Sequence, residues 1–106
     1  MKHEKLIDAL KGIQYIVINN CYGGFGLSEE ASNRYKEMAG ITDKDWWSRD
    51  VARDDPFLVK IVREMGKDAN GGHADLRIVE VPDGVEWEIE EYDGNEWVAE
   101  KHRTWR

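Results

Sequence analysis

Apolar residues recur with different periods in different parts of this chain. Over residues 14–20 they form a run rich in β-branched side chains, which is typical of a buried strand. Over residues 56–65 they recur every three to four positions, which predicts a helix with one apolar face. Over residues 85–90 they alternate with glutamates, which predicts a strand with one side in solvent. The pattern therefore predicts a protein that mixes helices and strands.

Capping residues give the bounds of the two main helices. Ser28 is a good N-cap for a helix over residues 29–39, which a glycine then ends. Asp54 or Asp55 caps the helix of residues 56–65, in which Pro56 takes the first position. Two shorter helical segments are expected over residues 6–10 and 42–47.

Two further strands are expected, over residues 76–81 and 96–102, the latter after a tight turn at Asp93 and Gly94. Two helices connect the first strand to the second, and a long crossover of this kind joins parallel strands. The last three strands form an antiparallel meander. We therefore expect an α+β fold with a single-layer, mixed, four-stranded sheet. One parallel crossover pair joins the meander in this sheet, and two to three helices pack on one of its faces.

The length of 106 residues suits a single domain with one modest core. No apolar run is long enough to span a bilayer, no secretory signal is recognisable, and the single Cys fits a reducing compartment. We therefore expect a cytoplasmic protein with no membrane partner.

The negative charge lies in the second half of the chain. Residues 1–53 carry eight basic and eight acidic side chains, whereas residues 54–106 carry seven basic and fourteen acidic ones. Residues 80–100 hold nine acidic side chains and no basic one. Such a field repels phosphate backbones and attracts basic surfaces, so we expect no direct nucleic-acid binding.

A loop with three glycines joins the first strand to the helix that Ser28 caps. This order of strand, glycine loop and helix is one in which backbone amides receive a ligand. The loop lacks the lysine of a P-loop, and Glu29 stands where a dinucleotide motif needs glycine. It is either a tight connection, over which Tyr22 and Phe25 pack, or a ligand site, with a base or ribose beside the loop. The candidate ligand-binding residues are Asn20, Cys21, Tyr22, Gly23, Gly24, Phe25, Gly26, Ser28 and Arg53.

The sequence offers little catalytic chemistry. Cys21 lies close to a helix N-terminus, but no spacing ties any of the three histidines to it as a base. No His or Cys cluster has zinc-ligand spacing, and helix capping explains the acidic pair after Arg53. We expect no catalytic residue, no metal and no cofactor, and an enzyme that depends on Cys21 stays open as an alternative.

Five tryptophans are many for a chain of this length. Trp87 belongs to the core face of its strand. Trp46, Trp47 and Trp105 are flanked by arginines, a combination that suits either stacking on a base or a subunit interface. Because a small chain has little room to bury them all, we expect a homo-oligomer.

Glu86, Glu88 and Glu90 form a stripe on the solvent side of their strand. Such a stripe is a solvated sheet face, a device that keeps a sheet edge from pairing, or an acidic comb. A comb of this kind would occupy the basic site of a nucleic-acid-binding protein.

Three segments resemble a family of small proteins encoded by bacteriophages and prophages. The likeness runs from Tyr15 onward, and CYGGFGLS and RDDP are its most specific parts. It implies that residues 1–14 are an N-terminal extension. It implies no activity and carries over no catalytic residue, but it implies an accessory protein made inside an infected bacterium. Such proteins often counter host defence, either by binding a defence protein or by sequestering a nucleotide signal. The segments are IVINNCYGGFGLSEEA, RDDPFLVKIVREMG and LRIVEVPDGVEWEIEEYDGNEWVAEKHRTW.

Two hypotheses about function follow. The first is a non-catalytic, homo-oligomeric protein that captures a small, nucleotide-derived ligand with the glycine loop and Arg53. The second is an acidic interaction protein that blocks a basic site on a host nucleic-acid-binding enzyme.

Overall fold

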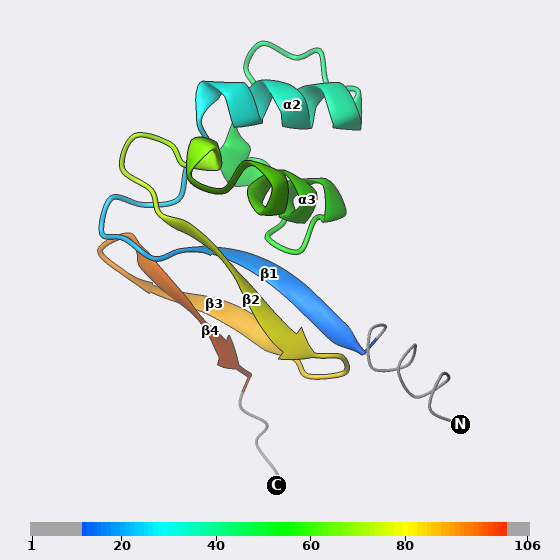
Figure 1. Cartoon of the computed structure of the whole chain (residues 1–106). Coiled ribbons are helices and arrows are strands. Elements are labelled where there is room, and N and C mark those ends of the chain that lie inside the picture. Colours follow the sequence, from blue (N-terminus) through cyan, green and yellow to red (C-terminus); the bar gives the residue numbers. More distant parts are fainter. Residues whose placement is uncertain (1–11, 102–106) are drawn as a thin grey trace, which may run out of the picture.

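The computed structural model of the chain describes residues 12–101 (Figure 1). The expected helix over residues 6–10, the last residues of the expected final strand, and Trp105 lie outside them. The first strand begins at Ile13, within the range that we expected to precede the fold. The elements are β1 (Ile13–Asn19), α2 (Glu29–Ala39), η1 (Ser48–Asp50), α3 (Pro56–Met65), η2 (Gly66–Ala69), β2 (Leu76–Pro82), β3 (Trp87–Tyr92) and β4 (Asn95–Glu100).

The α+β class is confirmed, but the expected parallel pair is wrong. β1 and β2 pair antiparallel, with Asn19 opposite Leu76 and Ile13 opposite Pro82. The two helices of the connection run in opposite directions, so the chain goes out along α2 and returns along α3. It therefore re-enters the sheet at the end where β1 finished, which makes the pair antiparallel.

The single four-stranded sheet is also not observed. β3 and β4 form their own antiparallel pair, so the strands make two two-stranded sheets. Figure 1 shows the helices on one side of β1 and β2 and the β3–β4 hairpin on the other. Val17 of β1 packs against the helices, whereas Ile16 and Ile18 pack against the hairpin. β1 is thus covered on both faces, as its unbroken apolar run indicates.

The caps of both helices are as predicted. The Ser28 hydroxyl accepts a hydrogen bond from the Ala31 amide, and Gly40 ends α2 in the left-handed conformation. The Asp55 carboxylate accepts from the first amides of α3, and Pro56 takes the first helical position. Neither helix within residues 12–101 has the length and apolarity that crossing a membrane requires.

Tyr35 joins α2 to the rest of the helical layer. Its ring stacks on Trp46 at 5.3 Å between centroids, and its hydroxyl donates to an Asp55 carboxylate oxygen at 2.7 Å. Burial, together with the hydrogen bond to the Asp55 carboxylate and its negative charge, raises the pKa of Tyr35 to about 12 from 10.0. The fold therefore favours the neutral phenol.

This shift predicts how stability depends on alkaline pH. Because the pKa of Tyr35 is raised in the folded state, the stability that Tyr35 contributes is complete below its unfolded pKa of 10.0. This stability is lost as pH rises to about 12. Tyr35→Phe is expected to cost about 1 kcal/mol at pH 8 and to lose less stability between pH 8 and pH 11 than wild type. Urea unfolding at both pH values measures this. Equal losses in the two proteins would contradict the assignment.

Candidate functional site

A buried asparagine that the sequence reasoning did not single out anchors the start of the glycine loop. The Asn19 side chain is fully buried at the end of β1. Its amide nitrogen donates to the carbonyls of Cys21 and Gly94, each at 2.7 Å, and its oxygen accepts from the Asp75 amide at 2.8 Å. Asn19 thus ties together the loop, the hairpin turn and the residue before β2. A polar residue at the end of an apolar run was its only signal in the sequence.

The turn between β3 and β4 lies directly on the glycine loop. Gly94 has a φ of 90°. A Cβ placed on it would lie 2.6 Å from the Tyr22 carbonyl oxygen and 2.5 Å from the Gly24 nitrogen. Gly23 in turn leaves no room for a side chain against the backbone of His73. Two glycines are therefore required by close contacts between segments that are distant in sequence.

A pair of variants separates this close contact from the effect of φ alone. Gly24 has a similar φ of 92°, but a Cβ on it would meet no atom within 4 Å. Gly24→Ala is expected to cost about 1 kcal/mol, and Gly94→Ala about 2 to 3 kcal/mol, because its methyl group must push the loop away. Thermal or urea unfolding of the two variants measures the difference. Equal costs would show that the turn and the loop do not touch.

The far end of the loop is held by main-chain hydrogen bonds. The Gly71 amide donates to the Gly26 carbonyl, and the Ser28 amide donates to the Ala69 carbonyl, both at 2.9 Å. The Ser28 hydroxyl donates to the Asp68 carbonyl while it caps α2. Ser28 is therefore occupied by the fold itself.

The middle of the loop is open. Asn20 donates its amide to the Asp75 carbonyl, but within the described part of the chain the amides of residues 21–26 donate to no protein acceptor. Tyr22 is 66% exposed and does not cover them. Phe25 is half-buried, with the Arg53 guanidinium 3.7 Å above its ring. Free amides of this kind are able to meet a ligand.

Arg53 is bound on the fold side by a bidentate ion pair. Its two terminal nitrogens lie 2.5 and 2.9 Å from the two carboxylate oxygens of Glu96, and both side chains are mostly buried. The Glu96 carboxylate also accepts a hydrogen bond from the backbone amide of Asn19 at 2.8 Å. The Arg53 carbonyl accepts one from the backbone amide of Val17 at 2.8 Å. The pair therefore closes the end of the β1 edge. The sequence marked Arg53 but gave no sign of Glu96 as its partner.

A small cavity lies between the loop and the hairpin. Its volume is about 250 Å³, and its charged lining residues are one cation, Arg53, and two anions, Glu91 and Glu96. The Arg53 charge is already matched by Glu96, so Glu91 leaves the cavity with an excess negative charge. This field disfavours a phosphate and favours a neutral polar group or a cation. The remaining lining residues are Gly24, Phe25 and Gly94.

Cys21 lies half-buried at the start of the loop. Among the described residues its thiol forms no hydrogen bond with a histidine, although His73 lies against neighbouring Gly23. Over residues 12–101 no three His, Cys, Asp or Glu side chains gather closely enough to hold a metal ion. The loop therefore offers open backbone amides, and within residues 12–101 no histidine is hydrogen-bonded to the Cys21 thiol.

The outer face of the β3–β4 hairpin combines acidic and aromatic side chains. Trp87, Ile89 and Val98 pack inward against β1, so the alternate residues face outward. Glu90 lies opposite Trp97, whose indole nitrogen donates to the Glu90 carboxylate at 3.0 Å. Tyr92 is 71% exposed and Trp97 is 42% exposed. We call this surface the acidic–aromatic face and define it as Glu88, Glu90, Tyr92 and Trp97.

The other tryptophans have separate roles. Trp87 lies on the core face, as predicted, and its indole donates to the Gln14 side chain at 3.0 Å. Trp46 packs on Tyr35, whereas Trp47 is 60% exposed. Both line one surface pocket beside α2, and self-association through them stays a prediction.

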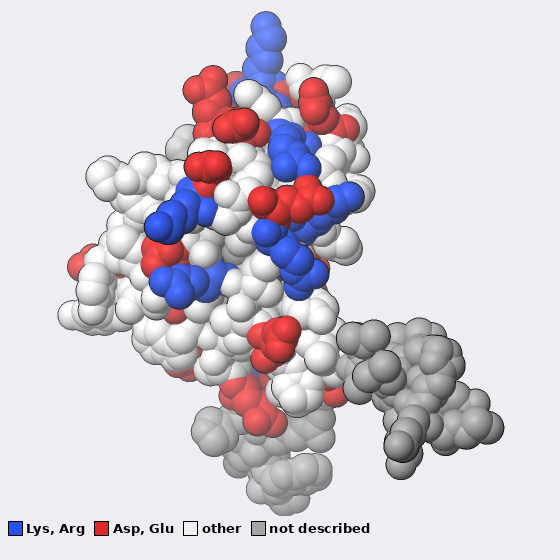
Figure 2. All heavy atoms as spheres, viewed as in Figure 1, with Lys and Arg blue, Asp and Glu red and all other residues white. Residues whose placement is uncertain are grey.

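Charge is distributed unevenly over the molecule. Figure 2 shows Lys and Arg side chains gathered over the helices and neighbouring loops, whereas acidic side chains also extend down over the strands.

The chain was compared with protein-family models, curated proteins and solved structures, and it matches none of them. The function is therefore inferred from the geometry of the surfaces described above.

Proposed function

We propose that the protein is a non-catalytic interaction module whose acidic–aromatic face binds a basic surface of a partner protein. The observation that carries this proposal is the cross-strand pair of Glu90 and Trp97 beside exposed Tyr92. Trp and Tyr are enriched among the few residues that carry most of the binding energy at protein interfaces, and the surrounding carboxylates select a partner of opposite charge.

The cavity on the other side of the hairpin extends the same argument, although Glu91 and Glu96 face away from Glu90 and Trp97. Its excess negative charge and its volume of about 250 Å³ suit one lysine or arginine side chain of the partner. The open amides of the glycine loop lie next to it and would take a carbonyl of the same partner. The loop and the cavity would therefore form a second contact region, on the opposite side of the hairpin from the acidic–aromatic face.

The resemblance to phage-encoded proteins suggests the setting. An accessory protein in an infected bacterium gains from blocking a host enzyme that handles nucleic acid, since such enzymes present basic sites. The carboxylates of Glu88 and Glu90 on the acidic–aromatic face would occupy such a site in place of phosphates.

Capture from a bacterial lysate with matched variants tests the proposal. The face variant is Glu88→Lys with Glu90→Lys, and the control is Glu29→Lys with Glu30→Lys, which makes the same charge change at exposed positions of α2. We expect wild type and the control to retain the same basic protein and the face variant to lose it. Retention of nothing, or equal retention by all three proteins, would end the proposal.

A second candidate function is capture of a small, nucleotide-derived ligand at the glycine loop. The open amides of residues 21–26 and the Arg53 guanidinium over Phe25 favour it. The acidic cavity restricts the contact to a base or ribose, with the phosphate held away in solvent. Isothermal titration with cyclic and linear nucleotides tests it, with Gly24→Val as the loop variant. No heat from any nucleotide with the folded wild type rejects it.

A further inference from the structure

The edge of β1 that faces away from β2 is only partly covered. In an antiparallel strand the N–H and C=O groups of alternate residues point to opposite edges. The Val17 amide donates to the Arg53 carbonyl at 2.8 Å. The backbone N–H and C=O groups of the odd-numbered residues of β1 therefore point away from β2. The backbone groups of Ile13 and Tyr15 therefore point to this same outer edge.

This part of the edge has no partner within residues 12–101. No backbone acceptor or donor meets the outward groups of Ile13 and Tyr15 there. Arg53 covers the edge at Val17, and the chain then turns away into α3. Two N–H and two C=O groups are left for another strand. We call residues 13–15 the open edge.

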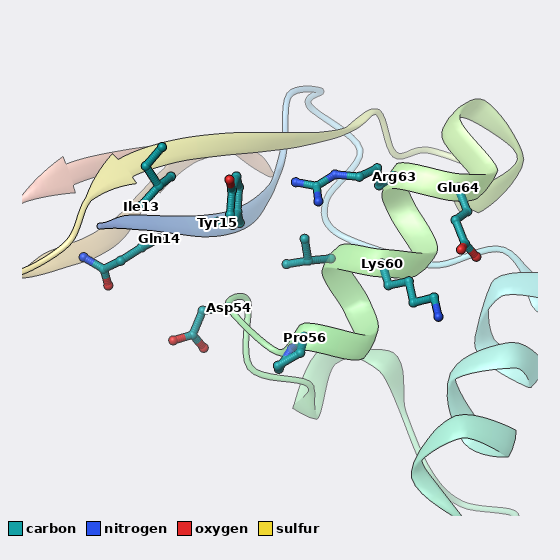
Figure 3. Close-up of a pocket in the computed structure, with 9 residues that line it drawn as sticks. Ile13, Gln14, Tyr15, Asp54, Pro56, Lys60, Arg63 and Glu64 are labelled. Atoms are coloured by element: carbon teal, nitrogen blue, oxygen red, sulfur yellow. The ribbon is translucent and has the colours of Figure 1, made fainter. Parts of the chain in front are cut away.

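A groove runs beside the open edge, between β1 and α3 (Figure 3). Its volume is about 590 Å³, which lies within the usual size range of ligand pockets. Ile13 and Tyr15 line it from the strand, and Pro56 and Val59 line it from the helix side. The groove therefore offers apolar contacts next to unpaired backbone groups.

One positive charge faces this groove without an acidic partner. The Arg63 guanidinium lies 4.7 Å over the Tyr15 ring, and Arg63 forms no ion pair within the described part of the chain. Figure 3 shows Arg63 pointing toward Tyr15, whereas Lys60 and Glu64 point away from the strand. Glu64 is paired with Arg34 at 2.5 Å, so it does not neutralise Arg63. Asp54 lies at the other end of the groove.

We propose that the open edge and this groove bind an extended peptide segment of a partner protein as an added strand. The peptide would pair with the backbone of Ile13 and Tyr15 and place an apolar side chain against Val59. Because alternate side chains of a strand share a face, the residue two positions away would reach Arg63. An acidic side chain at that position matches the charge of Arg63. This site is separate from the acidic–aromatic face and does not depend on its function.

Hydrogen exchange on the full chain gives the first test. The Tyr15 amide is expected to exchange at least about 100-fold faster than the amides of Ile16 and Val17, which are bonded within the fold. A protected Tyr15 amide would mean that the chain's own residues occupy the edge, and this result overturns the proposal. Protection that rises with protein concentration would assign the edge to a second copy and overturns it as well.

Titration with a blocked peptide gives the second test. The probe is acetyl-Thr-Val-Thr-Glu-Thr-amide, and its control has Lys in place of Glu. We expect the Glu peptide to slow exchange of the Tyr15 amide saturably and to bind at least about tenfold more tightly than the Lys peptide. Arg63→Gln is expected to remove this preference, whereas Lys60→Gln, at a side chain that points away, keeps it. No effect on Tyr15 at about 5 mM peptide, or equal binding of both peptides, overturns the proposal.

Discussion

Replacing Arg53 with Met is expected to lower the free energy of unfolding by about 3 kcal/mol, because it leaves the Glu96 carboxylate mostly buried without its counter-charge. The pair is bidentate, and only 19% of the Arg53 side chain and 10% of the Glu96 side chain are exposed. The variant also loses the guanidinium contact with the Phe25 ring. Urea unfolding followed by circular dichroism measures the change.

Two comparisons isolate the ion pair. Arg77→Met breaks an exposed pair with Asp75 and is expected to cost less than about 1 kcal/mol. Combining Arg53→Met with Glu96→Gln removes both charges while an amide oxygen still accepts the Asn19 amide, so we expect about half of the lost stability to return. A cost for Arg53→Met no larger than that for Arg77→Met would mean that the pair does not hold the β1 edge.

Replacing Asn19 with Ala is expected to cost about 3 kcal/mol, because it leaves two partly buried carbonyls and one partly buried amide without their partner. The same change frees the hairpin turn from the glycine loop, so the effect reaches both segments. Thermal unfolding monitored by calorimetry measures the loss.

The neighbouring asparagine provides the control. The Asn20 side chain is exposed, and only its backbone amide is bonded, to the Asp75 carbonyl. Asn20→Ala is therefore expected to stay within about 0.5 kcal/mol of wild type. Similar losses at both positions would contradict the anchoring role of Asn19.

Local structure was predictable where a physical rule acts over a few residues. Ser28 and Asp55 cap the helices as their side-chain chemistry requires. The turn at Asp93 and Gly94 forms because both residues tolerate the positive φ that a tight hairpin needs. These features depend on neighbours in sequence, so the sequence contains them directly.

The arrangement of the strands was not predictable in the same way. Whether β1 and β2 run parallel depends on the direction in which α2 and α3 return the chain, which no local pattern encodes. The apolar run of β1 was correctly interpreted as buried. It did not reveal that the β3–β4 hairpin, rather than a second helical layer, covers the face of Ile16 and Ile18.

The candidate site shows the same division. Gly23 was predicted as a candidate ligand-binding residue because it lies in the glycine loop. The structure adds a close contact with His73 that no sequence spacing predicts. Arg53 was marked as a ligand contact, whereas Glu96, its partner in the ion pair, comes from a strand far along the chain. The alternation of glutamates predicted the outward stripe, but the pairing of Glu90 with Trp97 required the register of the hairpin.

The affinity of the captured basic protein, measured by isothermal titration, tests the central claim most directly. With Glu88→Lys and Glu90→Lys together we predict binding at least about 100-fold weaker than wild type. The control, Glu29→Lys with Glu30→Lys, should stay within about threefold of wild type, because these exposed positions lie on α2. Equal affinities for wild type and the face variant would contradict a role for the acidic–aromatic face.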